Sequence, residues 1–187
     1  MLIRLARDAD VPKLRELIER SARALSVGYY SDVQIESAVR YVFGVDSSLI
    51  SDRTYFVAET QGVLAGCGGW SRRRNLYGGD QRPAGSMELL DPALEAARIR
   101  AFFVAPEYAR HGIGRRLLET CAAAAREAGF RRLELMATLP GVPFYRNVGF
   151  RECEPFTDTL PDGTRIVFVR MEQPLSDSRG EQGAEPD

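Results

Sequence analysis

Two hydrophobic periods alternate along the chain, and the points where one replaces the other divide it into strands and helices. Short runs rich in β-branched and aromatic residues predict strands, whereas apolar residues recurring every three or four positions predict amphipathic helices. We expect strands at 2–5, 54–59, 63–70, 98–104, 132–137, 150–155 and 164–171. We expect helices that begin at Asp8 or Asp10 and at Ser31, and further helices at 112–128 and 140–148. Because these two helices precede most of the strands, we expect them to cover an edge or an opening of the structure that the later segments form.

The turn between the strand at 98–104 and the helix at 112–128 has the features of an anion site. The first amides of a helix have no partner within the helix, and the helix dipole adds partial positive charge there. Gly112 and Gly114 lack the Cβ atoms that would hold a phosphate away from those amides. Taken alone, two glycines before a helix fit an ordinary loop as well.

The predicted strand at 63–70 contains three glycines, Gly66, Gly68 and Gly69. Glycine weakens a strand, because it adds backbone entropy to be lost and offers no side chain to pack. The three glycines therefore indicate either a bulge or the close approach of another group. A twisted strand beneath a helix explains them equally well.

The segment 71–97 is the least regular part of the chain. A connection of this length inside a compact domain is uncommon and is often functional, with disorder as the alternative. It carries the triplet Arg72, Arg73 and Arg74, and Arg98 follows it. These arginines favour the hypothesis of an acceptor that bears a carboxylate or phosphate, although a solvated run of charge explains them too.

Composition narrows the class of protein further. The chain has 187 residues with a net charge of −1, which suits one domain and gives no case for nucleic-acid binding. We see neither a signal peptide nor an apolar run long enough to span a membrane. Cys67, Cys121 and Cys153 form no metal-ligand spacing, so we expect buried thiols, no metal site and a reducing cytoplasmic location. Few apolar residues occur at 174–187, which predicts a disordered tail.

Two local motifs combine into a family resemblance. The first is Val104–Ala105–Pro106–Glu107–Tyr108–Ala109–Arg110–His111–Gly112–Ile113–Gly114, and the second, about thirty residues later, is Phe144–Tyr145–Arg146–Asn147–Val148–Gly149–Phe150. Together they resemble the acetyl-CoA-binding motif and the following aromatic motif of the GCN5-related N-acetyltransferase (GNAT) family. The resemblance covers residues 1–173. It departs from the family pattern at Ala109, where the motif commonly has Gln or Arg, and at Thr138, near a common Asn.

The resemblance implies an α/β (α+β) GNAT fold in a single domain at 1–173. Its central sheet would be mixed and mostly antiparallel, with six to seven strands flanked by about four helices and splayed at the acetyl-CoA site. The implied reaction is direct transfer of an acetyl group from acetyl-CoA to a primary amine of a small molecule or peptide. The resemblance also allows a homodimer. The residues it assigns to acetyl-CoA are Phe103, Val104, Ala109, Arg110, His111, Gly112, Ile113, Gly114, Arg115 and Thr138.

Tyr145 matches the family tyrosine that lies beside the thioester sulfur, where it is the implied general acid. Tyrosine has a reference pKa of about 10 and a thiol about 8.5, so full proton transfer is uphill by about 2 kcal/mol. A hydrogen bond to the developing thiolate is an equally good interpretation, and a purely structural role in the core is the third.

The residue that deprotonates the amine is left open by the sequence. Glu88, Asp91, Glu95 and Asp46 are expected to be solvated surface residues, and His111 belongs to the phosphate turn. A chain of water molecules is the remaining candidate. Because no base is evident, an acetyl-CoA-binding sensor without transfer is the alternative function. A nucleoside-triphosphate enzyme is disfavoured, since the chain has no G-x-x-x-x-G-K-[ST] motif.

Overall fold

One seven-stranded sheet organises the computed structural model, which describes residues 1–82 and 88–175. The strands are β1 (Leu2–Leu5), β2 (Tyr55–Thr60), β3 (Val63–Ser71), β4 (Ala97–Val104), β5 (Arg132–Thr138), β6 (Arg151–Thr159) and β7 (Arg165–Pro174). The helices within these ranges are α1 (Val11–Leu25), α2 (Asp32–Tyr41), α3 (Ser47–Ser51), α4 (Ile113–Glu127) and α5 (Val142–Asn147). Short 3₁₀ turns occupy Asp8–Asp10, Pro106–Tyr108 and Leu139–Gly141.

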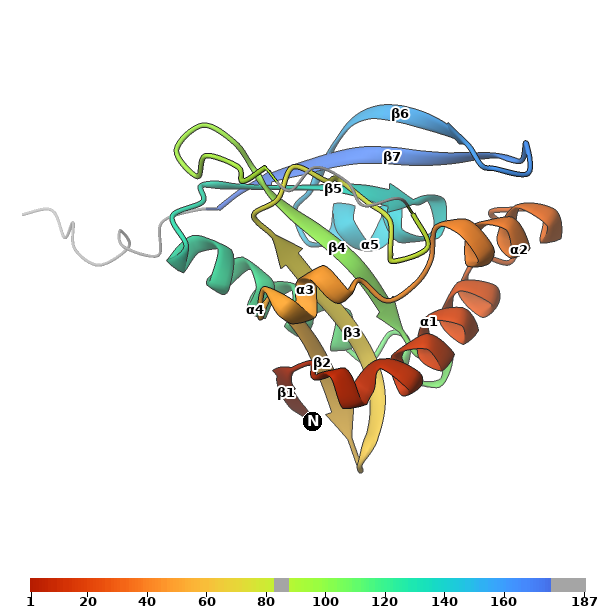
Figure 1. Ribbon diagram of the computed structural model, residues 1–187, viewed down its shortest axis with the longest axis horizontal. Helices are drawn as coiled ribbons and strands as arrows, with labels where there is room; N and C mark the ends of the chain where they lie inside the picture. Colours follow the sequence, from red (N-terminus) through yellow and green to blue (C-terminus); the bar gives the residue numbers. More distant parts are fainter. Residues whose placement is uncertain (83–87, 176–187) are drawn as a thin grey trace, which may run out of the picture.

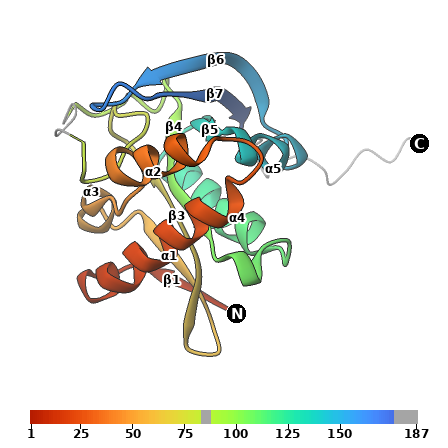
Figure 2. The same ribbon diagram turned by 90° about the vertical axis from the view of Figure 1, so that its right-hand side faces the viewer.

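The helices cover both faces of the sheet (Figures 1 and 2). The strand order is β1-β2-β3-β4-β5-β7-β6, and each neighbouring pair is antiparallel except β4 and β5, which are parallel. Helices α1, α2 and α3 lie on one face, and α4 and α5 lie on the other. The core is accordingly divided into clusters on the two faces, one containing Leu14 and Ile18 of α1 and the other containing Leu118 and Cys121 of α4. The predicted mixed, mostly antiparallel α/β sheet is confirmed.

The predicted strands and main helices are all present, with small differences at their ends. A capping box begins α2 at Ser31, because the Ser31 hydroxyl accepts a hydrogen bond from the Gln34 amide and the Gln34 side-chain oxygen accepts one from the Ser31 amide. Helix α3 was not predicted, because five residues are too few to show a helical hydrophobic period. At the other end, Pro174 belongs to β7 and Leu175 is buried, which corrects the expected start of the tail. Residues 176–187 lie outside the described residues, so their disorder and the single-domain boundary stay predictions.

Close packing explains the glycines of β3. A Cβ on Gly68 would lie 2.2 Å from the ring of Phe102, and one on Gly66 would lie 3.0 Å from Ile113 Cγ2 at the start of α4. The strand is also irregular opposite β4, where the register shifts between Cys67 and Gly69. The irregular register and the close approach suggested by the sequence are both present, and Gly66 also lies beneath α4, as the alternative of a strand under a helix expects.

Strands β4 and β5 separate soon after they meet. Only Ala97 and Arg98 of β4 pair with β5, opposite Leu133 and Glu134. Beyond this point the backbone of β4 is distorted, because Ala101 has a φ of 51°. A non-glycine residue in this conformation is uncommon and marks a local departure from the strand. The sheet therefore opens between its two central strands.

Tyr77 of the connection between β3 and β4 is docked on the α1–α2 face, whereas Leu90 of the same connection packs in the cluster of the α4–α5 face. The ring of Tyr77 packs edge-on against Phe156 and tilted against Phe168, with centroids 5.8 and 5.6 Å apart. The Asp80 carboxylate accepts hydrogen bonds of 2.9 Å from both the amide and the hydroxyl of Ser47. These contacts hold Tyr77 against β6 and β7 and Asp80 against the start of α3. Disorder does not describe this part of the segment.

Candidate active site

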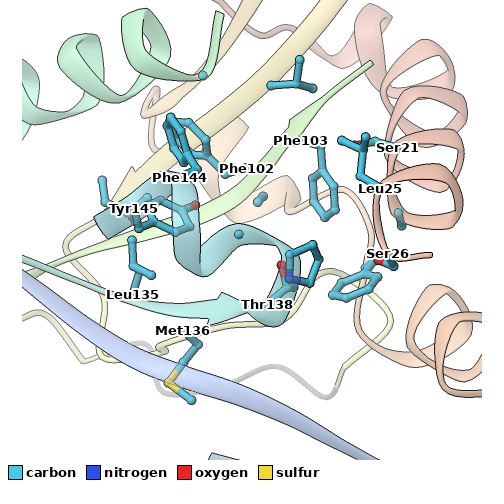
Figure 3. A pocket seen from close by; sticks show the side chains of 18 of the residues that line it. Ser21, Leu25, Ser26, Phe102, Phe103, Leu135, Met136, Thr138, Phe144 and Tyr145 are labelled. Carbon is cyan, nitrogen blue, oxygen red and sulfur yellow. The ribbon is translucent and has the colours of Figure 1, made fainter. Parts of the chain in front are cut away.

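A cavity of about 570 Å³ passes through the sheet where β4 and β5 separate. Consecutive side chains of a strand point to opposite faces of the sheet. Two consecutive residues of β4 and two of β5 line the cavity. Phe102 and Leu135 belong to the cluster on the α4–α5 face, whereas Phe103 and Met136 belong to the cluster on the α1–α2 face. Figure 3 shows these side chains, with Tyr145 on one side of the cavity and α1 on the other. One continuous space therefore reaches both faces of the sheet.

The predicted glycine turn forms one end of this cavity. Arg110 and Gly112 both have left-handed backbone conformations, with φ of 67° and 79°. A Cβ on Gly112 would meet no atom within 4 Å, so glycine serves conformation there and not space. The Arg116 amide makes the first bond of α4, to the Gly112 carbonyl at 3.1 Å. The amides of residues 113–115 precede that bond and have no partner within the helix.

Positive charge gathers at the same turn. Arg110 and Arg115 both line the cavity, and neither forms an ion pair with a described residue. Gly114 also lines it, and a Cβ there would approach the Phe144 ring to 3.2 Å. Unpaired amides, a helix dipole and two arginines fit a diphosphate group.

Tyr145 occupies the wall between the glycine turn and β5. Its ring contacts Phe144 and Phe150, with centroids 5.0 and 5.5 Å apart, and only 8% of the residue is exposed. Burial, and next the nearby Cys121 thiol, raises the pKa of the Tyr145 hydroxyl above its ordinary value. The hydroxyl therefore stays protonated at neutral pH and can donate a hydrogen bond into the cavity. The raised pKa makes complete transfer of its proton still less favourable than in water.

The structure brings almost all of the predicted site residues to this cavity. Those that line it are Phe103, Val104, Ala109, Arg110, Gly112, Ile113, Gly114, Arg115, Thr138 and Tyr145. His111 is exposed and does not line the cavity. Its Nδ1 lies 2.8 Å from the Ala109 carbonyl oxygen, which holds the ring within the turn.

The opposite end of the cavity was not predicted from the sequence. Its walls come from α1, α2, the β3–β4 connection and β7, and are formed mainly by Leu25, Val42, Phe43, Leu76, Tyr77 and Phe168. We call this end the α1 side. These residues share no pattern in the sequence, because they come from four separate segments of the chain.

The arginines proposed for an anionic acceptor lie elsewhere. Neither the triplet 72–74 nor Arg98 lines the cavity. Arg73 forms an ion pair with Asp52 at 2.7 Å, Arg74 pairs with Glu88 and Glu95, and Arg98 pairs with Glu134. Arg73, Arg74 and Arg98 thus have partners within the chain, and Arg72 is exposed away from the cavity, so the structure does not support a role for these arginines in recognising an acceptor.

Asp46 is buried, which contradicts the expectation that it is a solvated surface residue. Its Oδ2 lies 2.7 Å from Nη2 of Arg100, and both side chains are 5% exposed. The same Nη2 donates to the Gly78 carbonyl at 3.0 Å. Arg100 lines the cavity but Asp46 does not. Asp46 is therefore placed to neutralise Arg100 and to join β4 to the α2–α3 connection, and it is not placed to accept a proton from a molecule in the cavity.

Asp46→Asn is expected to lower the free energy of unfolding by about 3 kcal/mol or more, because it leaves the Arg100 guanidinium buried without this counter-charge. Urea unfolding would measure the change. The matched control is Glu36→Gln, which breaks the solvent-exposed pair with Arg23 and is expected to change the free energy of unfolding far less. Equal losses in the two variants would contradict a structural role for the buried pair.

Comparison with known proteins places the fold and the cavity in a family. The model of the Acetyltransferase (GNAT) family matches residues 12–150. No curated protein sequence gives a significant match. Among solved structures, a GCN5-related N-acetyltransferase from Rhodopseudomonas palustris has a TM-score of 0.70 at 18% identity, over 93% of this chain and 95% of that one.

Two further similar structures contain the cofactor. The PaiA N-acetyltransferase from Thermoplasma acidophilum, in complex with coenzyme A, has a TM-score of 0.62 at 18% identity, covering 92% of this chain and 98% of that chain. YncA from Salmonella typhimurium, a putative acetyltransferase with acetyl-CoA, has a TM-score of 0.61 at 17% identity, covering 100% and 98%. The family match spans most of the chain and these structures share its fold. The chain therefore belongs to the GNAT acetyltransferase family.

Proposed function

We propose that this protein transfers an acetyl group from acetyl-CoA to a primary amine. The observation that carries the proposal is the cavity that crosses the sheet between β4 and β5, with an anion-binding helix terminus at one end. Membership of the GNAT family and the cofactors of the similar structures support acetyl-CoA as the donor. Bound acetyl-CoA would supply the activated thioester that the amine attacks.

The residues of the glycine turn fit the role of holding the donor. The amides of Ile113, Gly114 and Arg115, with the side chain of Arg110, would bind the diphosphate of coenzyme A. Beyond Arg98, β4 has no ladder with β5, so backbone groups near Phe103 and Val104 are available to pair with the amides of the pantetheine arm. Thr138 would add a hydroxyl from the opposite strand.

The transfer itself needs proximity and a hydrogen bond to the leaving group. A neutral amine enters from the α1 side and attacks the thioester carbonyl, so that a C–N bond forms and the C–S bond breaks. The Tyr145 hydroxyl donates a hydrogen bond to the sulfur as negative charge develops there. The amine proton leaves to water. In the described part of the chain no Asp, Glu or His side chain lines the cavity, which favours solvent as the proton acceptor.

The same observation supports a second candidate, an acetyl-CoA sensor that performs no transfer. Incubation of the purified chain with acetyl-CoA and a panel of primary amines separates the two. We expect release of free coenzyme A in proportion to acetylated amine, measured with a thiol reagent and by mass spectrometry. Stabilisation of the fold by acetyl-CoA without turnover of any amine would favour the sensor.

Location and assembly are not fixed by the site. None of the helices in residues 1–82 and 88–175 is long and apolar enough to cross a bilayer. From the sequence we expect a cytoplasmic location, and the family resemblance allows a homodimer. Size-exclusion chromatography with light scattering would test the oligomeric state.

A further inference from the structure

The α1 side of the cavity has walls that suit an apolar molecule. Phe43 and Phe103 form an edge-to-face pair with ring centroids 5.8 Å apart, and both line this side. Phe168 and Tyr77 form a second aromatic wall, and Leu25 and Val42 lie between the helices and these rings. Aromatic walls offer large contact areas and ring faces that attract an ammonium group.

The polar groups on the α1 side are mainly neutral. Ser21 and Ser26 line it, and each is 3% exposed. Figure 3 shows both on the wall formed by α1, beside Leu25 and across the cavity from Phe144 and Tyr145. Hydroxyl groups accept hydrogen bonds from a single amine, but they cannot neutralise several positive charges.

Charge on the α1 side is limited to Arg100 among the described residues. Its Nη2 is already paired with Asp46 at 2.7 Å and donates to the Gly78 carbonyl, and its Nε and Nη1 atoms, which have no hydrogen-bond partner in the described part of the chain, are buried out of contact with solvent. An anionic acceptor therefore finds no exposed cation at this end. A polycationic acceptor finds no carboxylate among the described residues that line this side, and the segment 83–87, which lies outside the described residues, contains no ionisable side chain.

We infer that the acceptor is a primary amine carried on an apolar body, aromatic in the best case, with no second charged group. The inference rests on the proposed function and narrows its substrate class. Burial of the apolar body against Leu25, Phe103 and Phe168 supplies the affinity. A second charge on the acceptor would be desolvated without a partner, which excludes polyamines and amino acids.

Titration calorimetry on the full chain in saturating coenzyme A tests this inference, with 2-phenylethylamine, spermidine and glutamate as probes. We expect 2-phenylethylamine to bind at least tenfold more tightly than either of the other two. Leu25→Asp should weaken 2-phenylethylamine at least tenfold and strengthen spermidine, because it adds a carboxylate to the α1 side at a residue that is 38% exposed. Leu94→Asp is the matched control, since Leu94 is 73% exposed, is not part of the cavity wall and should change neither affinity.

Three results would overturn the inference. They are spermidine or glutamate binding as tightly as 2-phenylethylamine, Leu25→Asp behaving like Leu94→Asp, and the absence of binding by 2-phenylethylamine. Failure of the proposed function has a different signature. In that case 2-phenylethylamine binds with the expected preference, but incubation with acetyl-CoA yields no N-acetyl product.

Discussion

Gly112→Asp is expected to weaken coenzyme A binding by about a hundredfold. The substitution fits sterically, because a Cβ at this position meets no atom within 4 Å. Its φ of 79° is one that Asp and Asn tolerate better than most residues. The new carboxylate would stand at the N-cap of α4, beside the amides and arginines that we propose to hold the diphosphate. Two like charges about 6 Å apart at an effective dielectric constant of about 20 repel by about 3 kcal/mol, which gives the expected factor.

Gly112→Asn separates charge from conformation in this experiment. It has nearly the same shape and the same backbone preference as Gly112→Asp but carries no charge. We expect it to weaken coenzyme A binding less than about tenfold, with calorimetry used for both variants. Equal effects of Asp and Asn would mean that the backbone conformation alone matters, and the anion site proposed at this turn would then be wrong.

Local patterns along the chain were sufficient to predict most of the fold. The strand ends at 2–5 and 132–137 and the helix after Gly112 agree with the structure to within a residue or two, because they depend on periodicity and on glycine turns. The glycine turn and the motif around Tyr145, both identified in the sequence, contain residues that line the cavity. Each motif is a short contiguous segment, so it can be identified from the sequence without knowledge of tertiary contacts.

The α1 side of the cavity could not be predicted in this way. Leu25, Val42, Tyr77 and Phe168 are brought together by the docking of α1, α2 and the β3–β4 connection on one face. Each of them has the hydrophobicity of an ordinary core residue, so no local signal distinguishes a cavity wall from packed interior. Only tertiary contacts make that distinction.

The buried ion pairs of β4 join segments that are distant in the sequence. Arg98 and Arg100 alternate with Ile99 along β4, but no local pattern in the sequence identifies the carboxylates that oppose them. Glu134 comes from the neighbouring strand, and Asp46 comes from a connection more than fifty residues earlier in the chain. A buried charge is strongly destabilising without its partner, so each of these carboxylates is buried only because the fold places an arginine beside it. An exposed carboxylate was the reasonable expectation for Asp46 and was wrong for this reason.

Tyr145→Phe is expected to reduce kcat for acetyl transfer by about ten- to a hundredfold, with little change in KM for acetyl-CoA. The ring contacts with Phe144 and Phe150 are retained in Phe, so the cavity wall stays in place. The lost hydroxyl removes one hydrogen bond to a developing thiolate, and hydrogen bonds to charged groups are worth about 1.5–3 kcal/mol. Tyr41→Phe is the control, because Tyr41 does not line the cavity and the substitution should leave kcat unchanged.

The pH dependence of the wild type gives the sharper test of how Tyr145 acts. Burial disfavours the phenolate and raises the pKa of this hydroxyl, so the donor is present at every pH below its raised pKa and is lost only above it. The rate should therefore rise with pH as the amine acceptor loses its proton, and Tyr145 should cause no decline below about pH 10. A decline near pH 8 or 9 that disappears in Tyr145→Phe would show that the hydroxyl titrates in the working range and donates its proton outright. A decline that persists in Tyr145→Phe would belong to another group and would leave the hydrogen-bonding role of Tyr145 in place.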